Sequence, residues 1–280
     1  MKVSVLIENE SCNKNLKHEH GLSLHINYFG KNILFDTGAT GIFLENAENM
    51  GINIKDVDFV VISHAHLDHA GGLIRFLEIN KKAKVYMSGN SKNRYYVKVS
   101  LIKREVSIPK EVFRKYENRI VFVNDFCEIT ESIYIIPNSI ERSFPLGSSS
   151  KQLIVRRDDN FERDNFNHEI SLVINNNDRL EIFTGCSHNG ISNMVEHAKS
   201  FFPAISIHTV VGGFHLMGIP FKNRLGETKQ FIKSLAVNMV EFNIERVYTA
   251  HCTGRKAYEI LREVMGERIT YIHTGSVLEL

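Results

Sequence analysis

The stretch VVISHAHLDHAGGL at residues 60–73 constrains this chain more than any other, because an apolar strand runs directly into a cluster of polar side chains. The cluster contains four residues of types that bind transition metals, namely His64, His66, Asp68 and His69. Residues two apart in an extended chain point the same way, so His64 and His66 can bind one ion together. Asp68 and His69 follow on a turn and can face a second ion. A solvated, histidine-rich loop is the alternative, but this spacing directly after an apolar strand favours a metal site.

Strand-like and helical patterns follow one another along the rest of the chain. Gly71 and Gly72 are expected to let the backbone turn tightly from the histidine cluster into a short helix. Apolar residues at helical spacing predict further helices near residues 40–51, 191–201, 227–242 and 255–266, with β-branched runs between them as strands. A strand-rich first part followed by alternating strands and helices predicts a layered α/β protein.

Residues 88–165 have a different character, since they are richer in lysine and arginine and contain only short strand-like runs. We interpret them as a small α+β insertion, for which a ferredoxin-like arrangement is one candidate. The insertion would interrupt a single domain that spans residues 1–280.

The overall composition narrows the partners that this protein is expected to bind. Hydrophobic residues make up 43% of the 280 positions and the formal net charge is only +2, so neither nucleic acid nor an anionic membrane is expected. No segment approaches the roughly 20 apolar residues that span a bilayer. Four cysteines without a C-x-x-C pair indicate reduced thiols and a cytoplasmic protein. A small molecule, which could carry a phosphate, is the expected substrate, and self-association is left open.

Several motifs together resemble a known family. HAHLDH at residues 64–69 and LFDTG at residues 34–38 are similar to the two hallmark motifs of the metallo-β-lactamase fold superfamily. EHGLSLHI, TGCSHNGI, VVGGFHL and HCTG resemble one branch of it, known as metal-dependent hydrolases of the β-lactamase superfamily II or as 7,8-dihydropterin-6-yl-methyl-4-(β-D-ribofuranosyl)aminobenzene 5′-phosphate synthase. The resemblance covers residues 1–90 and 165–280. It implies a four-layer αββα sandwich with a small α+β insertion.

The resemblance also implies roles for particular residues. It makes His64 and His66 ligands of a first ion, and Asp68, His69 and His251 ligands of a second ion. Asp36, in the DTG motif, would hydrogen-bond to a ligand or to the loop that carries the ligands, and would thereby orient them.

Two positions depart from the family pattern. Many members place a bridging aspartate in a TGD turn, whereas Cys186 stands at that point here and His188 follows two residues later. We infer that His188 replaces a histidine that the family usually supplies earlier in the chain. Cys186 is either a ligand or a buried neighbour. This set of nitrogen and sulfur donors favours zinc in one or two copies, with manganese and iron as alternatives.

Four further residues are candidates for contact with the substrate. His215 follows a strand that ends in two glycines, so it could act on the substrate or serve only the structure. His20 could line the cleft, although a histidine in such a turn is more often simply on the surface. Arg94 and Tyr95 could bind a phosphate and stack on a flat heterocycle if the insertion folds over the site, although a basic stretch is usually only a solvated face.

The function expected from these residues is metal-dependent hydrolysis. A metal-bound hydroxide would attack a phosphate ester, ester or thioester, with Asp68 holding the nucleophile and His215 or a second ion stabilising the developing charge. The first alternative is a transferase of the dihydropterin synthase type named above. The second alternative is a sensor that binds metal and ligand without turnover.

Overall fold

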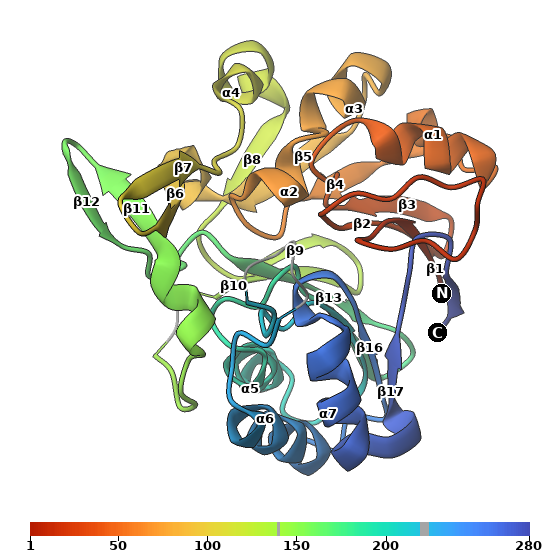
Figure 1. Cartoon of the computed structure of the whole chain (residues 1–280). Coiled ribbons are helices and arrows are strands. Elements are labelled where there is room, and N and C mark those ends of the chain that lie inside the picture. The colour runs from red at the N-terminus through yellow and green to blue at the C-terminus, as the bar shows by residue number, and fades with distance from the viewer. Residues whose placement is uncertain (139–140, 219–223) are drawn as a thin grey trace. The chain divides into compact units, whose positions relative to one another are not determined.

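The computed structural model describes residues 1–138, 141–218 and 224–280, and the chain divides into two compact units. The first unit comprises Met1–Asn124, Leu153–Asp164 and Ile272–Leu280, and the second comprises Asp125–Gln152 and Asn165–Tyr271. Each unit is built on a seven-stranded mixed sheet that carries helices (Figure 1). No helix among the described residues is long and apolar enough to cross a membrane.

The sheet of the first unit has the strand order β18-β1-β2-β3-β4-β5-β8. Its strands are β1 (Lys2–Ile7), β2 (Ser23–Tyr28), β3 (Lys31–Phe35), β4 (Phe59–Val61), β5 (Lys84–Ser88), β8 (Ile120–Val123) and β18 (Val277–Glu279). The pairs from β18 to β3 are antiparallel, and those from β3 to β8 are parallel. All three residues of β4 are buried, as expected for a central parallel strand that is covered on both faces.

Helices connect the parallel strands of the first unit and bury their apolar faces on the sheet. They are α1 (Ile42–Asn49), α2 (Leu67–Ala70), α3 (Leu73–Ile79) and α4 (Lys110–Tyr116). Phe43 and Ala47 of α1 and Phe76 of α3 join one buried core with Val60 of β4. The helices predicted near residues 40–51 and after the histidine cluster are therefore confirmed.

The sheet of the second unit repeats this plan, with the order β17-β16-β15-β14-β13-β10-β9. Its strands are β9 (Cys127–Thr130), β10 (Ile133–Pro137), β13 (Ile170–Asn175), β14 (Arg179–Phe183), β15 (Ser206–Gly212), β16 (Arg246–Thr249) and β17 (Ile269–Tyr271). The parallel strands from β14 to β17 are connected by α5 (Ile191–Phe201), α6 (Lys229–Glu241) and α7 (Arg255–Met265). The helices predicted near residues 227–242 and 255–266 are confirmed, and Ile232, Leu235, Ile260 and Leu261 all lie in the core, whereas Val264 is exposed.

A third, four-stranded sheet belongs to the first unit and has the order β12-β11-β6-β7. Its strands are β6 (Arg94–Val99), β7 (Ile102–Glu105), β11 (Leu153–Arg157) and β12 (Asn160–Arg163). Residues 88–165, interpreted above as one insertion, thus contribute to all three sheets, because β8 belongs to the first seven-stranded sheet and β9 and β10 to the second.

In both units the candidate residues follow the carboxyl ends of parallel strands. Asp36 follows β3, and the histidine cluster follows β4. Cys186 and His188 follow β14, while His215 follows β15 and His251 follows β16. Open α/β sheets bind their ligands at this edge, where the loops are free to carry chemistry.

Candidate functional site

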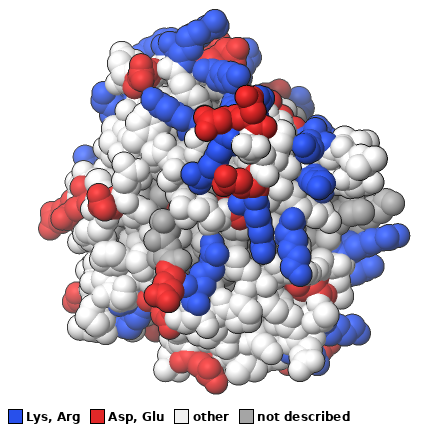
Figure 2. Space-filling model, turned by 90° about the vertical axis from the view of Figure 1, so that its left-hand side faces the viewer, with Lys and Arg blue, Asp and Glu red and all other residues white. Residues whose placement is uncertain are grey.

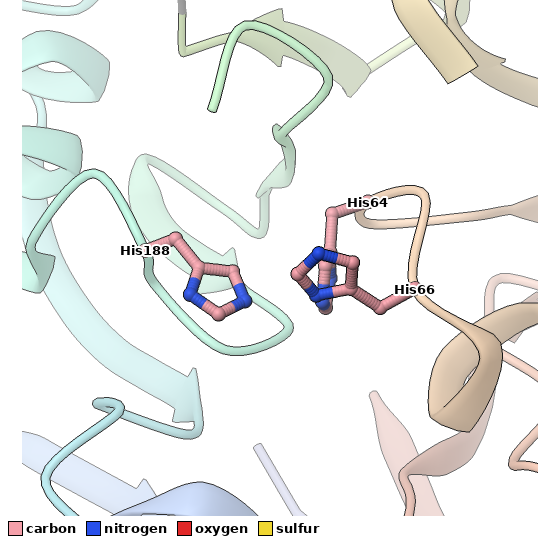
Figure 3. A group of neighbouring side chains, drawn as sticks. All are labelled: His64, His66 and His188. Carbon is pink, nitrogen blue, oxygen red and sulfur yellow. The ribbon is translucent and has the colours of Figure 1, made fainter. Parts of the chain in front are cut away.

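The first unit gathers three buried imidazoles beyond the end of β4. The ring centroids of His64 and His66 are 4.6 Å apart, and those of His64 and His69 are 4.1 Å apart. Figure 3 shows His64 and His66 leaving the loop after β4, and His66 is the residue that precedes α2. This loop is fixed from the side, because Leu67 donates its backbone N–H to Val106 at 2.7 Å and His66 forms a β-bridge with Ser107.

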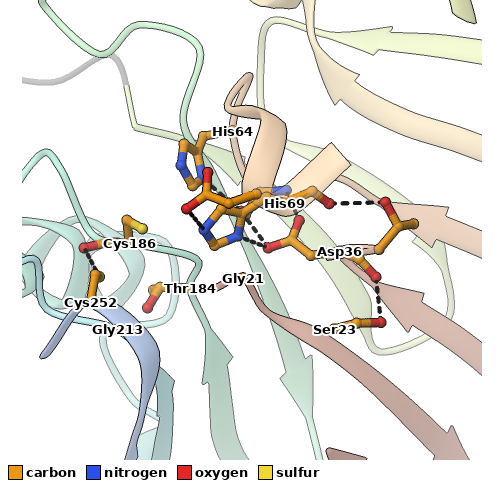
Figure 4. Close-up of polar contacts among 12 residues, drawn as sticks. Gly21, Ser23, Asp36, His64, His69, Thr184, Cys186, Gly213 and Cys252 are labelled. Carbon is orange, nitrogen blue, oxygen red and sulfur yellow. Dashed lines mark hydrogen bonds and ion pairs between the residues drawn. The ribbon is translucent and has the colours of Figure 1, made fainter. Parts of the chain in front are cut away.

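Asp36 connects the loops that carry these histidines (Figure 4). Its buried carboxylate accepts hydrogen bonds from the backbone N–H of Ser63 at 2.7 Å and from the Ser63 hydroxyl at 2.7 Å. It also contacts Nδ1 of His69 at 2.6 Å. The Ser63 hydroxyl in turn lies 2.9 Å from Nδ1 of His64. One carboxylate therefore reaches two of the three imidazoles, one directly and one through a hydroxyl.

These hydrogen bonds determine which ring nitrogen carries the proton. An ionised carboxylate only accepts hydrogen bonds, so Nδ1 of His69 must be the donor to Asp36. Ser63 has a single hydroxyl hydrogen and donates it to Asp36, so Nδ1 of His64 must in turn donate to Ser63. In the neutral ring Nε2 of both histidines is then a lone-pair nitrogen, which is the form that binds a metal. The residues of the first unit therefore fit a divalent ion.

Asp68 lies beside this cluster and has a second histidine neighbour. Its Oδ2 is 3.4 Å from Nε2 of His20 and 3.8 Å from Nε2 of His69. The side chain of Asp68 keeps 24% of its surface exposed, in contrast to the buried imidazole of His69. The structure thus brings His20 to a carboxylate at the cluster instead of leaving it among unrelated surface residues.

The two glycines after the cluster are needed for a different reason than the predicted tight turn. Both have ordinary helical backbone angles, with φ of −66° at Gly71 and −76° at Gly72. A Cβ at Gly71 would lie 2.0 Å from the carbonyl oxygen of Ala39, and one at Gly72 would lie 2.2 Å from that of Thr40. The absence of a side chain therefore lets the loop after β3, which begins with Asp36, pack directly against the histidine loop.

The second unit gathers its own ligand-type side chains beyond β14, β15 and β16. The ring centroids of His188 and His215 are 4.3 Å apart. The side-chain donor atoms of Cys186, His215 and Cys252 all lie within 4.8 Å of one another. His188 leaves the loop between β14 and α5 (Figure 3), and Cys186 and Cys252 face each other across two loops (Figure 4). His251 is fully buried beside Cys252.

Glu169 fixes the position of the His188 loop, and the sequence analysis did not identify it. Its fully buried carboxylate accepts hydrogen bonds from the backbone N–H groups of His188 at 2.8 Å and Asn189 at 2.9 Å. Burial raises the pKa of Glu169 above its ordinary value, although these N–H donors oppose the shift. Phe166 stacks on the His188 ring with a centroid distance of 4.8 Å. The only signal in the sequence was an acidic residue at the start of an apolar strand.

Cys252 is a second residue that the sequence analysis passed over. Its sulfur accepts the backbone N–H of His215 at 3.2 Å and lies 3.6 Å from the carbonyl oxygen of Cys186. Burial raises the pKa of the Cys252 thiol, but hydrogen bonding to Cys186 and His215 and the charge of His251 outweigh burial and lower it well below its ordinary value. The two cysteines are therefore neighbours in one polar cluster.

Arg94 and Tyr95 make structural contacts within the first unit. Arg94 forms an ion pair with Glu105 and donates to the carbonyl oxygen of Ile108 at 3.0 Å. The Tyr95 ring is buried and lies 6.0 Å from the His66 ring, and its hydroxyl donates to Asn90. Figure 2 shows acidic and basic side chains interleaved on the face that carries this small sheet. Phosphate binding by Arg94 and stacking by Tyr95 therefore stay predictions.

Comparison with known proteins identifies the class. Residues 26–131 match the family model of the Metallo-beta-lactamase superfamily. A solved structure described as a metal-dependent hydrolase of the β-lactamase superfamily is 28% identical and superposes with a TM-score of 0.84, covering 100% of this chain and 99% of its own. The protein therefore has the metallo-β-lactamase fold, and the resemblance to that superfamily predicted from the sequence is confirmed. The predicted fold class is confirmed as well.

Within the superfamily, one curated relative is similar over nearly its whole length. It is the 7,8-dihydropterin-6-methyl-4-(beta-D-ribofuranosyl)-aminobenzene-5'-phosphate synthase of Methanocaldococcus jannaschii, which is 29% identical over 93% of this chain and 90% of the relative. Zinc-bound PqqB from Methylobacterium extorquens is 13% identical with a TM-score of 0.61 over both whole chains, a likeness of fold alone.

Proposed function

We propose that this protein is a metal-dependent enzyme that acts on a small molecule, with one or two divalent ions, most simply zinc, as cofactor. The observation that carries the proposal is the set of hydrogen bonds that joins Asp36 to Ser63, His64 and His69. These bonds leave Nε2 of both histidines unprotonated, which is the form that binds an ion. A buried group of imidazoles with fixed tautomers has no use in packing a core, because each buried polar ring costs desolvation energy.

Each unit contains proposed metal ligands. His64, His66, Asp68 and His69 are the proposed ligands in the first unit, and His188 and His251 are those in the second. Cys186 is proposed as a further ligand, because a thiolate suits zinc and this sulfur lies in a polar cluster. The resemblance to the superfamily supports this set, since residues 64–69 match its H-x-H-x-D-H motif.

We further propose hydrolysis of a phosphate ester, ester or thioester as the reaction. A divalent ion would lower the pKa of a bound water toward neutrality and polarise an oxygen of the substrate. Asp68 would accept the proton of the attacking group on Oδ2, and His20, 3.4 Å away, would share that proton. His215 would stabilise negative charge that develops at the reacting centre. The relative described as a metal-dependent hydrolase, 28% identical, supports this choice.

Transfer of a dihydropterin, through its methyl carbon, to an arylamine ribose phosphate is the second candidate. The observation that favours it is the similarity to the archaeal synthase, which extends over nine-tenths of both chains. In that reaction an ion held by the same residues would stabilise the departing diphosphate instead of activating water.

One experiment separates these candidates. Protein purified without added zinc is analysed for bound metals, and is then assayed with phosphodiesters, lactones and thioesters and, separately, with a dihydropterin diphosphate plus an aminobenzoate derivative. A metal-dependent release of product in the first set supports the hydrolase, and one in the second set supports the transferase. Tight metal binding with no turnover in either set would leave the sensor as the correct function. A His66→Gln variant that retains the full metal content and activity would refute the whole proposal.

A further inference from the structure

The second unit contains a cavity to which neither the proposed ligands nor the comparisons assign a function. Its volume is about 270 Å³, equal to roughly nine waters at the 30 Å³ each takes in the liquid. That volume suits one single or fused ring system. The cavity lies between the segment 144–150, the first turn of α5, the loop after β15 and one face of α6.

The walls of the cavity are held by specific hydrogen bonds. Phe144 donates its backbone N–H to Asn193 at 2.8 Å and accepts the Asn193 side-chain amide at 3.0 Å, which ties the segment to α5. Ser149 donates its N–H to Glu227 at 2.7 Å and its hydroxyl to the carbonyl oxygen of His215 at 2.7 Å. The cavity is therefore preformed, and a ligand would not have to order these loops.

The lining of the cavity is aromatic and uncharged. Phe144, Phe214 and Phe231 line it together with serines and asparagines, and no lysine, arginine, aspartate or glutamate among the described residues lines it. A phosphate or carboxylate placed here would lose its hydration without gaining a charged partner. An uncharged ring would gain aromatic contacts on its faces and hydrogen bonds from hydroxyl and amide groups at its edges.

His215 joins the cavity to the proposed metal ligands within the same unit. Its side chain lines the cavity, while its ring lies 4.3 Å from that of His188. A ring bound in the cavity would therefore have a substituent on the His215 side within reach of His188. This is the arrangement in which a non-reacting part of a substrate positions the reacting part.

We propose that this cavity binds the uncharged aromatic or heteroaromatic ring of the substrate and directs the reacting substituent past His215 toward the metal ligands. The inference rests on the proposed function, because it assumes that the chemistry takes place at His188. It goes beyond that function by limiting the substrate class to small molecules with a neutral ring next to the reacting bond.

Ser234 allows a direct test, because it lies exposed on α6 and lines the cavity. Ser234→Trp would place an indole ring at this wall of the cavity without disturbing the core, because Ser234 is not part of it. Val237, three residues further along α6, is 44% exposed and does not line this cavity, so Val237→Trp is the matched control. The chain has no tryptophan of its own, so each variant adds a single reporter for the folded state.

Binding of 6-hydroxymethylpterin, a neutral fluorescent heteroaromatic probe, is measured by fluorescence anisotropy on the zinc-loaded protein. Ser234→Trp is expected to weaken binding at least about tenfold, as for a blocked pocket, and Val237→Trp is expected to leave it within about twofold. Phe231→Leu is expected to weaken it by about threefold to tenfold through the loss of one aromatic contact. Inorganic phosphate is not expected to displace the probe.

Three results would overturn the inference: no binding of the probe to the parent protein, equal binding to both tryptophan variants, or displacement by phosphate. Zinc content and turnover on the substrate panel are measured on the same samples. If metal-dependent turnover is intact and Ser234→Trp does not change the affinity for the probe, ring binding in the cavity is rejected and the proposed function is kept. Probe binding that is lost in Ser234→Trp, without turnover of any substrate, would keep the cavity and reject the enzyme.

Discussion

Replacing Asp36 with asparagine should disable two proposed metal ligands at once while hardly changing the shape of the site. The backbone N–H of Ser63 points at Oδ1 of Asp36 from 2.7 Å, so the new amide must keep its oxygen there. Its NH2 group then occupies the place of Oδ2, facing the Ser63 hydroxyl and Nδ1 of His69. The Ser63 oxygen and Nδ1 of His69 must now accept hydrogen bonds from this NH2 group, so the proton of the His69 ring moves to Nε2. Ser63 donates to His64 instead, which puts the proton of that ring on Nε2 as well.

The size of the effect follows from the number of ligands that are disturbed. Loss of one orienting partner typically costs 10-fold to 100-fold in metal affinity, or about 1.4–2.7 kcal/mol. Asp36 orients both His64 and His69, so we expect the upper end of this range or more. The free energy of unfolding of the metal-free protein should fall by about 1–3 kcal/mol, because buried charge-assisted hydrogen bonds are lost.

Zinc affinity is measured by competition with a chelating dye, and unfolding of the metal-free protein is followed in urea. Asp58→Asn is the control, since Asp58 lies in the same unit and its carboxylate accepts from Asn32 and Lys82 away from the histidines. The control should keep its zinc affinity. Zinc affinity of Asp36→Asn within about twofold of the parent, with an intact fold, would show that the tautomer argument is incorrect.

Three more substitutions test other parts of the structure. Glu169→Gln should lower zinc affinity by about 10-fold to 100-fold, because the amide cannot accept from both His188 and Asn189; an unchanged titration would remove Glu169 from the site. Gly71→Ala should lower the free energy of unfolding by about 3 kcal/mol or more, since its methyl group meets the carbonyl oxygen of Ala39, and a urea midpoint equal to the parent's would contradict this contact. Burial lowers the pKa of His25 below its ordinary value of about 6.5, with the charge of Lys2 adding to the shift. The unfolded chain therefore binds a proton at His25 before the folded chain does, so stability is fully present above about pH 6.5 and is lost as the pH falls toward the depressed pKa. His25→Gln should lose less stability than the parent over that interval, and parallel pH profiles would exclude this role.

Local periodicity was sufficient to predict most of the regular structure. The stripes of α6 and α7 and the apolar run of β4 depend only on neighbours in the sequence, so their burial could be predicted without coordinates. The grouping of the histidines could be predicted for the same reason, since His64, His66 and His69 are close in the chain as well as in space.

Features that depend on strand order could not be predicted. Cys186 and Cys252 are 66 residues apart and become neighbours because β14, β15 and β16 lie side by side. Glu169 serves His188 only because the start of β13 comes close to the loop after β14. Only five residues separate β17 from β18, and yet the two strands belong to different sheets. The pattern of apolar residues along the chain does not show which sheet a strand joins.

The pairing of β18 with β1 bears on how the protein is made. Residues 272–280 complete the first unit, whose sheet begins at Lys2, and the backbone oxygen of Leu280 accepts from the amino group of Met1 at 2.7 Å. Domains usually fold in order as they leave the ribosome. Here the second unit has been synthesised in full before β18 emerges. Until then, the edge of the first unit's sheet at β1 lacks its partner strand. The unit that carries His64, His66 and His69 therefore completes its sheet only after the second unit has been synthesised.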